Sequence, residues 1–194
     1  MSPLKAIDIL TLALFALAGA TSGSSASDAP PTAVDLDGQP VHVFSDNAKA
    51  NVLLFVRTDC PLTNRYAPEV KRIAALFERD QVRFWMVYPD PSESADSIRK
   101  HLQTYGFPGR PLRDPDRALE QYAKASVAPE AAVFDGAGHL RYRGRIDDRW
   151  IAFGKSRQEA TRHDLELAIS EVLEGRALSV PETKAVGCYL ADLQ

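Results

Sequence analysis

Apolar and polar positions alternate along the chain in blocks that fit strands and helices in turn. The continuous apolar run 52–56 is typical of a strand buried on both faces of a sheet, and 82–88, apolar except for Arg83, is a second candidate for such a strand. Between them, apolar residues recur at helical spacing over 65–79, which predicts a helix packed on that sheet. Upstream, two short apolar stretches flank an Asp-Gly pair and predict a hairpin over 33–44.

The second half of the chain continues the alternation. Helices are expected over 93–105, 114–122 and 161–174, and strands over 131–134 and 140–145. Gly106 and Gly175 fit the stops of the first and last of these helices, and Pro115 fits the first turn of the second. Thr161 and Asp164 fit a capping pair at the start of the last helix. The order of elements predicts an α/β fold, a central mixed β-sheet flanked by helices.

The first thirty residues carry a different pattern. Lys5 precedes an apolar run over 7–20, which ends in the small-x-small pattern that a signal peptidase cuts. This run is too short to span a membrane comfortably. We therefore expect a signal peptide over 1–20, a flexible lead-in over 21–31 and one domain over 32–194. These segments predict export to the periplasm or the extracellular space, without stable membrane insertion after cleavage.

The composition narrows the function classes. The chain has 194 residues with 23 Lys and Arg against 26 Asp and Glu, a near-neutral balance that argues against a nucleic-acid partner. It has two cysteines, which excludes a disulfide-dense scaffold. Its four histidines show no metal-ligand spacing, so we expect no metal and no cofactor. The oligomeric state is left open.

Cys60 stands where the predicted strand at 52–56 gives way to a helix. Unpaired backbone N–H groups and the positive end of the helix dipole stabilise a thiolate at such a junction. We therefore expect the pKa of Cys60 to lie below the value of about 8.5 for a free cysteine. Arg57 and Arg65 add positive potential, whereas Asp59 opposes it. The alternative is a buried cysteine that only packs.

Three other positions carry weaker signals. Pro129 precedes the predicted strand at 131–134, either as an edge device or as a cis-proline. Cys188 follows Cys60 by 128 residues and is a structural partner, a resolving cysteine or a free thiol. Arg145 shares one strand face with two further arginines, which indicates a solvated face or a contact with an anionic substrate.

Taken in order, these motifs resemble the thioredoxin fold. They are closer to the redoxin domains related to alkyl hydroperoxide reductase and the thiol-specific antioxidant proteins. Residues 59–69 match the pattern Asp-Cys-Pro-x-x-Asn-Arg-Tyr-Ala-Pro-Glu of redoxin-like domains. The resemblance covers roughly 33–190. It implies that Cys60 is the redox cysteine and that Pro129 is the cis-proline lying against it.

The departures from these families are equally specific. Thr63 stands where Cys-x-x-Cys thioredoxins have their second cysteine, so a dithiol cycle within the motif is impossible, and its hydroxyl is a candidate hydrogen-bond donor to the sulfur. Peroxiredoxins have a threonine three residues before their cysteine. Here Arg57 holds that position, and Thr58 is the candidate donor to a thiolate or peroxide. Copper-delivering relatives need a second cysteine where this chain has Asn64.

The function implied by the resemblance is thiol–disulfide exchange. Cys60 would act as the nucleophile, Cys188 would resolve, and protein thiols or disulfides would be the partners. The catalytic candidates are Cys60, Cys188, Thr63, Pro129 and Thr58, and the candidate substrate-binding residues are Arg57, Arg65 and Arg145. Two alternatives are a peroxiredoxin-like antioxidant that reduces a small peroxide and a non-catalytic binding or redox-sensing module.

Overall fold

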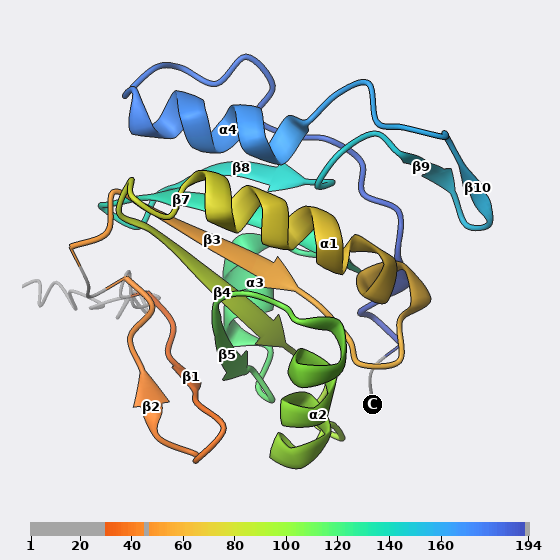
Figure 1. Ribbon diagram of the computed structural model, residues 1–194. Helices are drawn as coiled ribbons and strands as arrows, with labels where there is room; N and C mark the ends of the chain where they lie inside the picture. Colours follow the sequence, from red (N-terminus) through yellow and green to blue (C-terminus); the bar gives the residue numbers. More distant parts are fainter. Residues whose placement is uncertain (1–29, 45–46, 193–194) are drawn as a thin grey trace, which may run out of the picture.

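The computed structural model describes residues 30–44 and 47–192 (Figure 1). The predicted signal peptide and most of the predicted lead-in lie outside these residues. Within the described ranges, no helix is both long enough and apolar enough to cross a membrane.

A seven-stranded sheet forms the centre of the domain, with the strand order β2-β1-β5-β4-β3-β7-β8. Its strands are β1 Ala33–Val34, β2 Pro40–Val41, β3 Ala50–Phe55, β4 Val82–Tyr88, β5 Arg110–Arg113, β7 Glu130–Asp135 and β8 Leu140–Gly144. The pairs β3–β4 and β4–β5 are parallel and the remaining pairs are antiparallel. The sheet is therefore mixed, as the order of elements predicts.

Helices cover both faces of this sheet (Figure 1). They are α1 Pro61–Leu76, α2 Ala95–Tyr105, α3 Ala118–Ala123 and α4 Asp164–Leu173. Alternate residues of β3 enter separate apolar cores, because successive strand side chains point to opposite faces. Val52 and Leu54 pack with residues of α1, α2 and α4. Leu53 and Phe55 pack with residues of α3. The continuous apolar run of β3 thus reflects burial on both sides.

Two short ribbons complete the described structure. One pairs β9 Trp150–Ala152 with β10 Lys155–Ser156. The other pairs β6 Val127–Ala128 with β11 Cys188–Tyr189, antiparallel. Through this second ribbon the C-terminal tail returns to the segment that leads into β7 (Figure 1).

The structure corrects two predicted helix starts. The helix predicted over 114–122 begins only at Ala118, because the side chain of Asp114 accepts the N–H groups of Leu119 and Glu120 and holds the preceding residues in a turn. The capping pair predicted for the last helix is wrong. Thr161 donates its N–H and its hydroxyl to Asp148 instead, and α4 begins without a side-chain cap.

Candidate redox site

A disulfide joins Cys60 to Cys188, the two cysteines of the chain. Their Cα atoms lie 6.2 Å apart, within the distance of about 7 Å that a disulfide bridges without backbone movement. The free-thiol alternative for Cys188 is thereby excluded in this state. Cys60 is half of a disulfide here rather than a thiolate, and its side chain has no exposed area.

Cys60 is the residue that precedes the first turn of α1. Pro61 follows it and has no N–H, so the N–H groups of Leu62 and Thr63 are the first ones after Cys60 that lack a partner within the helix, and in the disulfide state the Cys60 side chain accepts from neither of them. These groups and the helix dipole favour negative charge on Cys60 after reduction. The sulfur also lies 3.0 Å from the carbonyl oxygen of Ala128. That oxygen accepts from a thiol S–H and opposes a thiolate, so the two influences compete.

The residues on either side of the disulfide are held by the ribbon of β6 and β11. Cys188 lies opposite Ala128, and Tyr189 lies opposite Val127. A cis peptide bond joins Ala128 to Pro129, the candidate cis-proline. Beyond β11, the N–H of Leu190 donates to the carbonyl oxygen of Ser126 at 3.0 Å. The tail therefore lies along the segment just before β7.

Glu130 holds the segment 126–128 by hydrogen bonds to its backbone. It was not among the site residues predicted from the sequence. Its Oε2 accepts the N–H groups of Ser126, at 2.7 Å, and of Val127, at 3.2 Å. The side chain is buried, so these bonds replace water around the carboxylate. Its place directly after the Ala-Pro pair is the sequence signal that could have identified it.

Arg57 ties the loop before Cys60 to the tail. Its guanidinium donates to both carboxylate oxygens of Asp59, at 3.1 and 3.0 Å, and to the carbonyl oxygen of Tyr189 at 3.3 Å. Asp59 thus compensates the positive charge of Arg57. The geometry gives Arg57 a structural role in holding the tail that the sequence did not indicate.

The other two arginines proposed to bind substrate have partners of their own. The Arg65 guanidinium lies 5.3 Å from the centre of the Trp150 ring. Nε of Arg145 donates to Asp164 at 2.6 Å, where α4 begins. Neither contact involves a cysteine, so the structure does not bring these arginines together around the disulfide.

The two candidate threonines occupy different environments. Thr63 is fully buried on α1, and its hydroxyl oxygen has no hydrogen-bond partner. The N–H of Thr58 donates to Oε1 of Glu93 at 2.6 Å. Glu93 is itself buried, and its Oε2 has no partner, so burial raises the pKa of this carboxyl. No sequence pattern pointed to Glu93.

A buried histidine links α2 to α1 one turn beyond Cys60. The Tyr88 hydroxyl lies 2.9 Å from Nδ1 of His101, and Nε2 of His101 lies 2.7 Å from Oδ1 of Asn64. Because the amide oxygen of Asn64 only accepts, Nε2 carries the proton and Nδ1 accepts from the tyrosine. Burial lowers the pKa of His101 to about 4. The neutral ring therefore supports the turn that follows Cys60.

We expect the substitution His101→Gln to flatten the acid limb of the stability curve. The pKa of His101 is about 6.5 in the unfolded chain and about 4 in the folded chain, so the unfolded chain takes up a proton there at a higher pH. The free energy of unfolding of the wild type should therefore fall by about 2 kcal/mol more than that of the variant between pH 7 and pH 4.5. Urea unfolding of both proteins at both pH values measures this difference.

The comparison between variants removes the contribution of Asp114. Burial raises the pKa of its carboxyl to about 6, so Asp114 lowers stability as the pH rises through the same window. That contribution is common to both proteins and cancels in the difference. Parallel pH curves for wild type and His101→Gln would contradict the proposed neutral bridge.

One cluster of two acidic residues and a histidine, within the described residues, has the geometry of a cation site. Ligand atoms of Glu69, Asp147 and His163 lie within 4.8 Å of one another. Both carboxylate oxygens of Glu69 accept from Arg72, at 2.9 and 2.8 Å, and Asp147 accepts from the Tyr66 hydroxyl at 2.7 Å. These ligand atoms are already used by protein donors, so the cluster is explained without an ion.

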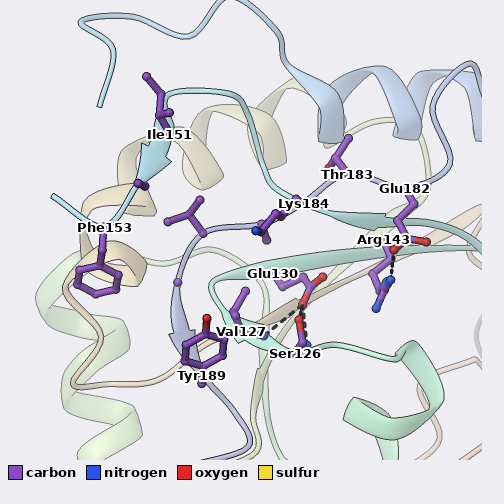
Figure 2. Close-up of a pocket in the computed structure, with 14 residues that line it drawn as sticks. Ser126, Val127, Glu130, Arg143, Ile151, Phe153, Glu182, Thr183, Lys184 and Tyr189 are labelled. Carbon is purple, nitrogen blue, oxygen red and sulfur yellow. Dashed lines mark hydrogen bonds and ion pairs between the residues drawn. The ribbon is translucent and has the colours of Figure 1, made fainter. Parts of the chain in front are cut away.

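A cavity of about 570 Å³ lies behind the β6–β11 ribbon (Figure 2). Tyr189 and Gly187 line it, whereas Cys188 between them turns toward Cys60, as alternation along a strand requires. Phe153, from the β9–β10 hairpin, also lines it and is 60% exposed. The cavity and the disulfide therefore lie on opposite faces of the ribbon.

The mixed sheet, the helices on both faces and the disulfide at the start of α1 define a thioredoxin-like α/β domain. An uncharacterized conserved protein from Geobacillus kaustophilus has a TM-score of 0.70 and 24% identity, over 84% of this chain and 88% of its own. A thioredoxin-like protein from Aeropyrum pernix has a TM-score of 0.56 and 12% identity, over 76% and 89%. A secreted Mycobacterium tuberculosis disulfide oxidoreductase homologous to E. coli DsbE has a TM-score of 0.51 and 18% identity, over 75% and 96%.

At these identities the likeness concerns the fold, and it confirms the predicted thioredoxin-like architecture. No protein-family model matches the sequence, and no curated protein matches it.

Proposed function

We propose that this protein is a thiol–disulfide oxidoreductase whose redox centre is the Cys60–Cys188 disulfide. The observation that carries the proposal is the position of this bond. Two cysteines separated by 128 residues meet where α1 begins, against the carbonyl oxygen of Ala128. One of the proteins that share the fold is described as a disulfide oxidoreductase. The partners proposed for the exchange are protein thiols and disulfides.

In the reduced state, Cys60 is the proposed nucleophile. The N–H groups of Leu62 and Thr63 and the unpartnered Thr63 hydroxyl are the groups available to stabilise its thiolate. Reoxidation closes the Cys60–Cys188 bond again and releases the partner as a thiolate. The contact of Arg57 with Tyr189 supports this closure, because it holds the tail beside Cys60.

We also propose that the protein works outside the cytoplasm. The basis is the signal-like pattern over 1–20, which is followed by a domain whose two cysteines form a disulfide. The M. tuberculosis protein that shares the fold is described as secreted.

A structural disulfide is the competing function, and the complete burial of Cys60 favours it. Redox potential separates the two proposals. A structural disulfide has a potential below about −300 mV, whereas exchange-active pairs lie between about −270 and −120 mV. The protein is equilibrated with glutathione or dithiothreitol buffers, alkylated, and weighed by mass spectrometry. A potential above about −270 mV is expected, and one below about −300 mV would assign the bond a structural role.

A second measurement addresses peroxide. The reduced protein is exposed to micromolar hydrogen peroxide and the sulfenic acid on Cys60 is trapped in the Cys188→Ser variant. Exchange without peroxidase activity predicts slow formation of sulfenic acid at the rate of an ordinary thiol. Rapid formation would instead identify the peroxide-reducing function.

A further inference from the structure

We propose that a partner thiolate opens the disulfide at Cys188 and that Cys60 departs as the leaving thiolate. This assignment rests on the proposed exchange function and specifies its first step. It reverses the role expected from the sequence, in which Cys60 meets the partner and Cys188 acts afterwards. In the oxidised protein, Cys188 is the sulfur that receives the partner.

Access is the first argument. A thiolate attacks a disulfide sulfur from the side opposite the bond that breaks, so the attacked sulfur must be reachable from solvent. Cys60 has no exposed area and belongs to the apolar core beneath α1. Cys188 is partly exposed, on a strand of two residues at the margin of the fold. An incoming thiolate therefore meets Cys188 first.

The leaving group is the second argument. The sulfur with the lower thiol pKa departs faster, and the start of a 16-residue helix favours the thiolate of Cys60. The buried Thr63 hydroxyl on the same turn has no partner and is available to donate to that anion. Cys188 lies on a strand without such a helix end. The Ala128 carbonyl oxygen and the apolar surroundings of Cys60 oppose a charge on its sulfur, so the exposure of Cys188 is the main reason for attack at Cys188.

The anchoring of the tail keeps Cys188 close to Cys60 while it carries a partner. Upstream, Thr183 is fixed by its N–H to the carbonyl oxygen of Arg143 at 3.1 Å and by its hydroxyl to Tyr142 at 2.7 Å. Cys188 follows five residues later, and Leu190, two residues beyond it, is buried and donates its N–H to the carbonyl oxygen of Ser126 at 3.0 Å. Once the disulfide opens, the ribbon with β6 and the Arg57 contact also still restrain the tail. Cys188 therefore carries its adduct on a segment held at both ends and stays within reach of Cys60.

The exchange balances in two steps. A partner thiolate RS⁻ forms RS–S–Cys188, the Cys60–Cys188 bond breaks, and the electron pair leaves with Cys60 as a thiolate. A second partner thiolate attacks the partner sulfur of RS–S–Cys188, forms RS–SR and releases Cys188 as a thiolate. Two partner thiols are oxidised, and the protein disulfide gains two electrons and two protons.

Glutathione is the probe for the first step. The oxidised full-length protein is mixed with excess glutathione, quenched with acid after short times, alkylated with N-ethylmaleimide in denaturant and digested with trypsin. Cleavage after Arg57, Arg65 and Lys184 places Cys60 in the peptide 58–65 and Cys188 in the peptide 185–194. We expect glutathione on 185–194, with alkylated Cys60 on 58–65, in about tenfold excess over the reverse pattern.

The same reaction in guanidinium chloride is the control, because unfolding exposes both sulfurs. In guanidinium chloride the two adducts should approach equal amounts. If the excess of glutathione on Cys188 were as large there as in the native protein, the fold would not determine which sulfur is attacked. An excess of glutathione on Cys60 in the native protein would overturn the assignment while the exchange function stands. Glutathione on neither peptide would overturn both.

Discussion

The substitution Cys188→Ser is expected to lower the free energy of unfolding by about 3 to 5 kcal/mol relative to the oxidised wild type. The disulfide closes a loop across a separation of 128 residues, and the restraint that a cross-link places on the unfolded chain grows with loop length. Guanidinium chloride unfolding followed by circular dichroism gives the difference. Wild type reduced with a phosphine should show a loss of the same size, because it lacks the same cross-link.

The folded structure should survive this change. The tail keeps its contacts at Thr183, and the sheet packs against α1 and α4 without help from the disulfide. The far-ultraviolet spectrum of Cys188→Ser should therefore match that of the wild type. A loss below about 1 kcal/mol would show that the unfolded chain is already restricted over this loop, contrary to the expectation.

The strands at the centre of the fold were predictable because local sequence determines them. The run 82–88 is β4, and 52–56 overlaps β3, since both are largely buried on two faces and so are apolar except for Arg83 at the start of β4. Cys60 could be placed at a strand-to-helix junction for the same reason. A strand signal ends just before it, and Pro61 begins a helix.

The cover over Cys60, which is the ribbon of β6 and β11, could not be predicted, because it depends on contacts between distant segments. β6 and β11 are two residues each, too short to leave an alternating pattern, and their pairing unites segments about sixty residues apart in sequence. Glu93 is similar: it is a single carboxyl whose significance comes from the Thr58 N–H that it accepts. The position of the sulfur at the strand-to-helix junction was therefore predictable, whereas the choice between a reactive and a buried Cys60 depended on these distant contacts.

Glu130 and Arg57 hold the β6–β11 ribbon in place beside Cys60. The carboxylate of Glu130 holds β6 from inside, and Arg57 holds the backbone of Tyr189 from the loop before Cys60. These two contacts fix both strands of the ribbon next to Cys188, the residue through which the disulfide joins the ribbon to Cys60. We therefore expect the tail to control access to Cys60.

The tightest point of this cover is Gly187, where substitution should have a large effect. A Cβ atom there would lie 2.2 Å from the carbonyl oxygen of Ala128 and 2.6 Å from its carbon. Both are backbone atoms that cannot rotate away, so Gly187→Ala must lift the tail from β6. We expect a loss of about 2 to 3 kcal/mol in the free energy of unfolding. The rate of disulfide reduction by dithiothreitol should rise about tenfold, because both sulfurs become more exposed.

Gly154→Ala is the matched control for this prediction. Gly154 has a φ of +74° and no atom within 4 Å of the added Cβ, so alanine there costs about 1 kcal/mol through backbone conformation without touching the tail. Its disulfide should be reduced at the wild-type rate, which separates a general loss of stability from movement of the tail. If Gly187→Ala were reduced as slowly as Gly154→Ala, the tail would not control access to the disulfide.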